Sequence, residues 1–145
     1  MNWRVQRRTL IPVMTRRVWL AIAASAPSLI AAAEDDARKN GEKWLALLDQ
    51  AKYKDAWKQA SQHHRPQITA DEWESQIRAM RAAAGSLQQR TYQSAKPTKS
   101  LAGAPDGDYL ILEYSTAYEK KSKAVEVVVM SKEAGGWKAA GYSIH

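Results

Sequence analysis

The side chains best suited to acid–base chemistry are one glutamate and two tyrosines in the C-terminal third of the sequence. Glu126 lies in an apolar run, and Tyr114 and Tyr118 lie in the run before it. If the two runs are antiparallel strands joined by a five-residue tip, 119–123, then Thr116 lies opposite Glu126. In a hydrophobic concavity the pKa of such a carboxyl group would rise, as general-base chemistry requires.

Two hypotheses follow for Glu126. The first makes it the base of a small-molecule enzyme of isomerase type, acting with Tyr114 or Tyr118. The second makes it structural or peripheral, either solvated or hydrogen-bonded to Thr116 or a tyrosine. We favour the second, because unpaired buried charge is rare and sequence spacing places no second acid, histidine or lysine beside it. Alternation puts one set of side chains on the same face: Leu110, Leu112, Tyr114, Thr116, Tyr118, Glu126, Val128 and Met130.

Other catalytic chemistries lack their motifs. His63 and His64 are adjacent and therefore point in different directions, and His145 is the last residue. The sequence has no cysteine and no HExxH, GxSxG, GxGxxG or P-loop pattern. We therefore expect no catalytic residue, no metal and no cofactor.

The net charge of +7 is concentrated at the N-terminus. Five of the 22 basic residues lie in the first 17 positions, so residues 34–145 hold 17 basic and 15 acidic residues, a net of +2. The two signs are interleaved there, which is typical of an ordinary solvated surface. We therefore expect no nucleic-acid partner.

The N-terminus has the organisation of a secretory signal peptide. Arg16-Arg17 precedes an apolar run, 18–30, and Ala31-Ala32-Ala33 gives a small-residue cleavage site before Glu34. The run is shorter than the roughly 20 residues of a membrane span. We expect a signal peptide over 1–33, cleavage near Ala33, and a periplasmic or secreted protein. Membrane contact would then occur only through the signal peptide before cleavage.

The remainder, 34–145, reads as one domain with its helices before its strands. Apolar spacing predicts helices over 37–51 and 53–60, with Gly41 weakening the first. Thr69 and Glu72 form a capping box for a third helix that ends at Gly85. Alternation then predicts a polar strand near 87–95 and a three-stranded meander over 109–144. This order is typical of an α+β fold, with three N-terminal helices packed on a curved antiparallel sheet.

The tryptophans allow two interpretations. Trp44, Trp57 and Trp73 fall one on each predicted helix and Trp137 on the last strand. They could line a ligand pocket, with Tyr114, Tyr118 and Glu126 as further lining residues. We favour a role as core anchors, because the sequence has no phenylalanine and large aromatic side chains are usually buried.

Several of these features together resemble a known family. The helix pair Trp44–Trp57 is followed by Trp73, Gly85 and Arg90, then by Pro105-Asp106-Gly107-Asp108-Tyr109, Glu126 and Gly136-Trp137-Lys138-Ala139-Ala140-Gly141-Tyr142. This set is similar to the domain of unknown function 4019 family of small exported bacterial proteins. The layout also resembles the nuclear-transport-factor-2-like (cystatin-like) cone. The resemblance implies a fold and an exported location but no reaction.

The function expected from the sequence is a non-enzymatic binding or interaction module of the cell envelope. The isomerase-type enzyme that uses Glu126 is the alternative. The expected partner is an envelope protein or a small apolar ligand, and the exposed face of the meander could pair two copies into a homodimer.

Overall fold

The computed structural model describes the backbone of residues 10–145 and the side chains from Leu29 onward. The chain divides into two compact units, with the boundary between Asp35 and Asp36. Each unit is described by itself. Helix α1, Leu10–Asp49, begins in the first unit and ends in the second.

The first unit contains the whole predicted signal peptide, 1–33, whose first nine residues lie outside the described residues. The predicted apolar run, 18–30, is helical. Its last two residues, Leu29 and Ile30, are 72% and 68% exposed. No helix among the described residues is both long and apolar enough to cross a membrane. Cleavage near Ala33 and the domain boundary at residue 34 stay predictions.

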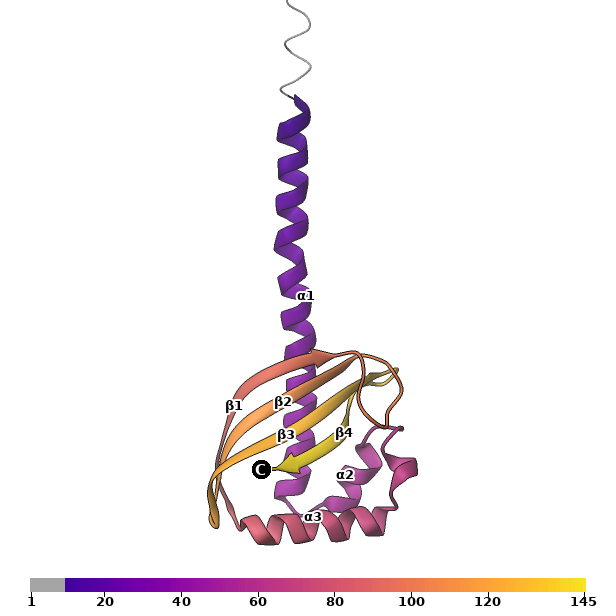
Figure 1. Ribbon diagram of the computed structural model, residues 1–145, viewed down its shortest axis with the longest axis vertical. Helices are drawn as coiled ribbons and strands as arrows, with labels where there is room; N and C mark the ends of the chain where they lie inside the picture. The colour runs from indigo at the N-terminus through magenta and orange to yellow at the C-terminus, as the bar shows by residue number, and fades with distance from the viewer. Residues whose placement is uncertain (1–9) are drawn as a thin grey trace, which may run out of the picture. The chain divides into compact units, whose positions relative to one another are not determined.

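The second unit is a helical layer against a four-stranded antiparallel sheet (Figure 1). The C-terminal part of α1 is followed by α2, Tyr53–Gln59, a short 3-10 helix η1, Arg65–Gln67, and α3, Ala70–Ala84. Strands β1, Leu87–Thr98, β2, Tyr109–Tyr118, β3, Lys121–Glu133, and β4, Gly136–Ile144, pair in sequence order. The predicted α+β class, three helices packed on a curved antiparallel sheet, is confirmed.

Local sequence signals explain where α3 begins and ends. The Thr69 hydroxyl accepts the Glu72 N–H, and the Glu72 carboxylate accepts the Thr69 N–H, which completes the predicted capping box. Gly85 follows the helix with a φ of +83°, a conformation that favours glycine. Trp73 and Ile77 form the buried stripe of this helix.

Gly41 does not weaken α1 as the sequence suggested, because α1 is continuous through it. A Cβ atom at residue 41 would lie 2.9 Å from Leu112 Cδ1 and 3.4 Å from Met130 Sδ. The glycine therefore lets the helix approach the central strands closely. Trp44, Leu45 and Leu48 continue the same buried face.

The predicted pairing of β2 with β3 is wrong by two residues. Glu126 pairs with Tyr114, and Ala124 pairs with Thr116. The strands are joined by Glu119-Lys120 alone, since 121–123 extend β3 instead of forming the tip. Two-residue connections are the commonest in hairpins. A shift of two residues keeps every side chain on its face, so the predicted face is buried as expected.

Candidate functional site

Glu126 is fully buried on the face of the sheet that the helices cover. Arg90 lies on β1, which is separated from β3 by β2. It donates from Nε to Glu126 Oε1 at 2.5 Å and from a terminal nitrogen to Oε2 at 3.2 Å. The Tyr118 hydroxyl donates to Oε2 at 2.5 Å, and the Tyr142 hydroxyl donates to the same oxygen. Both carboxylate oxygens are therefore engaged by side chains of the protein.

The interactions continue from Glu126 to the end of α1. Arg90 donates to both carboxylate oxygens of Asp49, at 2.7 and 3.0 Å. Arg81, on α3, donates to Asp49 Oδ1 at 2.9 Å and lies 3.7 Å from Glu126 Oε2. Two guanidinium groups thus face two carboxylates. We call these residues the Glu126 cluster: Asp49, Arg81, Arg90, Tyr118, Glu126 and Tyr142.

The protonation states of the cluster follow from its geometry. Burial alone would raise the pKa of Asp49, but its bonds to Arg90 and Arg81 outweigh this and hold that pKa below its ordinary value. Burial and the negative Glu126 raise the pKa of Tyr142, and burial with the hydrogen bond to Glu126 raises that of Tyr118. Both phenols therefore stay protonated and remain hydrogen-bond donors.

This arrangement corrects the expected surroundings of Glu126. A tyrosine partner was expected and is present, but the Thr116 hydroxyl does not bond to Glu126. The Thr116 Oγ1 atom is buried and has no hydrogen-bond partner within the described part of the chain. Sequence reasoning considered acids, histidines and lysines, and it missed the two arginines. Arg90 occupies a half-buried position in an otherwise polar strand. A predicted pairing of β1 with β2 would have indicated that the Arg90 side chain can extend over β2 to Glu126 on β3.

The predicted aromatic pocket residues do not converge on one cavity. Trp44 and Trp73 are each 5% exposed and belong to the packed core, together with Tyr114. Trp57 is half-buried and lines a shallow pocket of about 270 Å³ beside η1. Each of these indole N–H groups donates to a backbone carbonyl. Within the predicted set, Tyr118 is hydrogen-bonded to Glu126, and the rings of Trp44 and Trp73 pack against each other with 5.9 Å between centroids. Ligand binding by these six residues stays a prediction.

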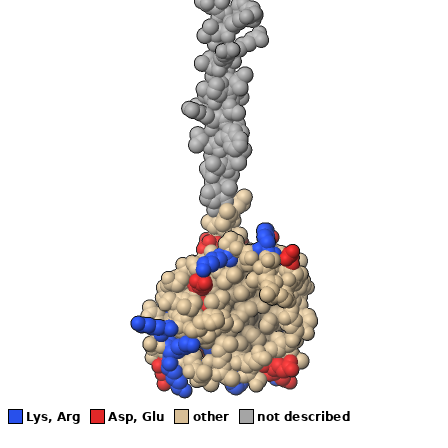
Figure 2. Space-filling view, in the orientation of Figure 1, with Lys and Arg blue, Asp and Glu red and all other residues tan. Residues whose placement is uncertain are grey.

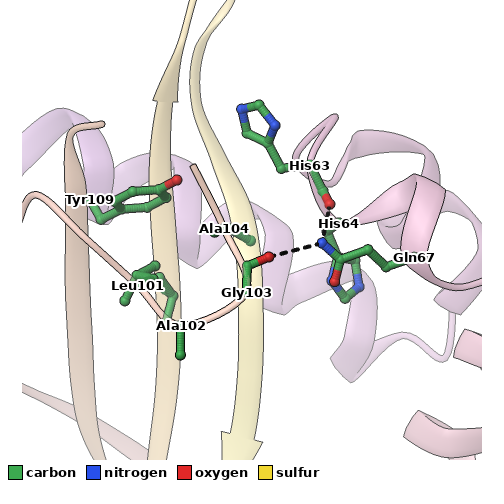
Figure 3. Close-up of a pocket in the computed structure, with 10 residues that line it drawn as sticks. His63, His64, Gln67, Leu101, Ala102, Gly103, Ala104 and Tyr109 are labelled. Atoms are coloured by element: carbon green, nitrogen blue, oxygen red, sulfur yellow. Dashed lines mark hydrogen bonds between the residues drawn. The ribbon is translucent and has the colours of Figure 1, made fainter. Parts of the chain in front are cut away.

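A second cavity, which the sequence did not indicate, lies where the residues around η1 meet the β1–β2 connection (Figure 3). Its volume is about 370 Å³. We call it the His64 pocket, and its lining residues come from the segment before η1, the β1–β2 connection and the strands: His63, His64, Gln67, Leu101, Ala102, Gly103, Ala104, Tyr109, Val129 and Ala140. Histidines apart, no residue of this lining carries a formal charge.

The backbone fixes the walls of the His64 pocket. The N–H of Ser61, a fully buried residue, donates to the Ala139 carbonyl at 2.7 Å, which joins the segment before η1 to β4. The register of β3 with β4 shifts at Val129/Met130, so that Ala140 is the extra residue of a bulge. Bulges re-aim side chains locally. The Gln67 amide donates to the carbonyls of His63 and Gly103, at 2.9 and 3.4 Å, as the dashed lines in Figure 3 show.

The His64 ring is the polar group on the inner side of this pocket. It meets the Trp73 ring edge-on, with 5.1 Å between centroids. Its Nε2 atom is buried and has no hydrogen-bond partner among the residues that the structure describes. Burial lowers the pKa of His64, so the ring is held neutral.

A third hollow, of about 460 Å³, opens beside Asp49 and Arg81 at the edge of the Glu126 cluster. Arg78, Glu119 and Lys120 also line it. Glu126 itself lines none of the three pockets described here. None of these three pockets therefore holds a substrate directly against the buried carboxylate.

The family comparison agrees with this fold. The model of the family described as "Protein of unknown function (DUF4019)" matches residues 40–142, which is most of the chain. The chain therefore belongs to the DUF4019 family. The search of the curated proteins found no match. The wider resemblance to the nuclear-transport-factor-2-like cone stays a prediction.

Proposed function

We propose that this protein is an exported binding module of the cell envelope that does not transform its ligand. Support for export comes from the N-terminal sequence, with its basic pair, apolar run and alanine cleavage site. Support for a binding role comes from the way in which Glu126 is used. Its two oxygens accept four hydrogen bonds from Arg90, Tyr118 and Tyr142.

A general base needs a free lone pair within reach of the substrate proton. Glu126 would have to exchange a charge-assisted bond to Arg90 for contact with a substrate, and none of the three pockets reaches it. Removing one partner from a buried ion pair is costly. The cluster is therefore better suited to holding α1, α3 and the sheet together than to proton transfer.

One observation favours the alternative, an enzyme of isomerase type. Two tyrosine hydroxyls converge on a buried carboxylate, with Tyr142 in the place that the sequence suggested for Tyr114. A protonated phenol beside a carboxylate is a common acid–base combination. The arginine contacts decide against it, because Arg90 already occupies both carboxylate oxygens and Glu126 lines none of the three pockets described above.

The surface supports a partner other than nucleic acid. On the face shown in Figure 2, cationic and anionic side chains are interspersed rather than gathered by sign. This face lacks the basic stripe that binding to phosphates requires, and residues 34–145 as a whole have a net charge of only +2.

The test begins with protein recovered from the envelope fraction of producing cells. Mass spectrometry is expected to find a mature N-terminus at or near Glu34. Native mass spectrometry of the same material is expected to show a complex of the protein with a small molecule. After denaturation the protein should have its unmodified mass, because the ligand is bound non-covalently. A product that retains Arg16 and Arg17 would contradict export with cleavage. Conversion of the bound molecule by the wild type, lost in Glu126→Gln, would establish the enzyme alternative instead.

A further inference from the structure

We infer that the His64 pocket is the ligand site of this protein and that it takes an uncharged, largely apolar small molecule with one hydrogen-bonding group. This inference rests on the proposed binding function and names the chemistry of the ligand. The cavity of about 370 Å³ lies in the size range of small-molecule pockets. One of its lining residues, His64, has a buried nitrogen, Nε2, that lacks a hydrogen-bond partner among the described residues.

The lining determines the polarity of the ligand. Leu101, Val129 and the Tyr109 ring supply apolar surface, and three alanines leave space between them. The Tyr109 hydroxyl is already committed to the Pro105 carbonyl at 2.5 Å. Because no Asp, Glu, Lys or Arg lines the pocket, a charged ligand would lose its hydration without compensation.

His64 determines where the polar group of the ligand binds. A neutral imidazole has one donor nitrogen and one acceptor nitrogen, so depending on its tautomer Nε2 can donate to a hydroxyl or accept from one. A buried polar atom without a partner destabilises the protein, and a ligand hydroxyl that bonds to it recovers part of this cost. The Trp73 ring supports the imidazole from one side and limits its rotation.

Gln67 joins two walls of the pocket. The exposed Gln67 side chain connects the segment of His63 to the loop of Gly103, and its bond to Gly103 is the longer one, 3.4 Å. Because His64 Nε2 is buried, a ligand must displace part of the lining to bond to it. Releasing the Gln67 amide from Gly103 would cost one weak bond.

Other unpartnered atoms do not define comparable sites. Tyr114 and Thr116 end in unpartnered hydroxyls but line none of the three pockets. Arg81 also has unpartnered nitrogens, and it does line a pocket. Its charge, however, already faces Asp49 and Glu126, and its guanidinium lies 5.6 Å from the Tyr118 ring centroid.

The test uses two small probes of similar size, 4-fluorophenol and fluorobenzene, in ¹⁹F NMR titrations of the whole protein. We expect 4-fluorophenol to bind about three- to tenfold more tightly than fluorobenzene, as one recovered hydrogen bond implies. His64→Phe should abolish this preference while keeping an aromatic ring against Trp73. His64→Gln, which keeps a hydrogen-bonding side chain, should restore part of it.

Two controls complete the design. His63→Phe makes the same change at the adjacent residue and should leave the preference for the phenol intact. Ala140→Leu should weaken both probes by filling the pocket. A melting curve for each variant confirms that it folds. The inference is overturned if wild type and His64→Phe discriminate equally, if Ala140→Leu binds both probes normally, or if neither probe binds. If envelope-derived protein nevertheless carries a bound molecule, the proposed binding function is retained, and the His64 pocket is excluded as its site.

Discussion

The Glu126 cluster and the His64 pocket differ in how their buried polar groups are partnered. In the cluster, four charged side chains from α1, α3, β1 and β3 meet one another, and two tyrosines complete the hydrogen bonds of Glu126. In the pocket, a neutral ring is half-buried with one nitrogen unpartnered. Buried charge must be compensated within the protein, whereas a neutral group can wait for a ligand at a smaller cost. Mutual pairing of the charges therefore marks the structural site, and the neutral ring with an unpartnered nitrogen marks the binding site.

The largest effect is expected from Arg90→Met in the cluster. This change leaves the fully buried Glu126 with only the longer, 3.7 Å contact to Arg81 and also removes two bonds from Asp49. Breaking a buried pair on one side costs about 3–5 kcal/mol, so the free energy of unfolding should fall by that amount. Urea unfolding followed by tryptophan fluorescence measures it.

The double variant Arg90→Met/Glu126→Leu sharpens the result. It removes both charges, so it should be more stable than the single variant. A double variant with the summed loss of both single changes would show that the pair is not coupled, and the structural account of the cluster would then fail.

Acid should affect the cluster in a defined pH range. The pKa of Asp49 is lower in the folded protein than in the unfolded chain, where it is near its ordinary value of 3.8. Its contribution to stability is therefore complete above that value and is lost as pH falls through the folded pKa. We expect Asp49→Asn to remove this part of the pH dependence, as seen in urea midpoints measured across the acid range. Parallel curves for wild type and variant would contradict the role given to Asp49.

The smallest change in stability is expected in the pocket, where a substitution should stabilise the protein instead of destabilising it. Burial lowers the pKa of His64, so the unfolded chain binds a proton at its ordinary value of 6.5 before the folded protein does. Stability should therefore decrease as pH falls from 6.5 toward the folded pKa. His64→Phe removes this dependence and an unpartnered nitrogen, so it should be at least as stable as wild type at pH 7.5, and its advantage should be larger near pH 5.5. Melting temperatures at the two pH values test this, with His63→Phe as the matched control.

Periodicity and local signals predicted the fold well. The Thr69 capping box, the turn at Gly85 and the alternation in β2 and β3 depend on neighbours in sequence, and each was readable there. The hairpin register was missed because a charged segment, 121–123, was taken for the tip. Gly41 was misjudged because its role depends on Leu112 and Met130, which are distant in sequence.

The sites were harder to predict for the same reason. Glu126 was recognised as notable, but its partners Arg90 and Tyr142 lie 36 and 16 residues away. The His64 pocket depends on the β4 bulge and on a bond between Gln67 and the Gly103 loop, neither of which leaves a periodic signal. Two adjacent histidines gave no indication that only the second would lie against Trp73.

The most direct test of this division of roles is to map a bound probe onto the backbone of the protein. In ¹H–¹⁵N correlation spectra, 4-fluorophenol is expected to shift the amide signals of residues 63–67 and 101–104 and to leave those of Arg90, Glu126 and Tyr142 unchanged. Shifts centred on Glu126 and Tyr142, with none at His64, would show that the compensated cluster is the binding site and would contradict the account.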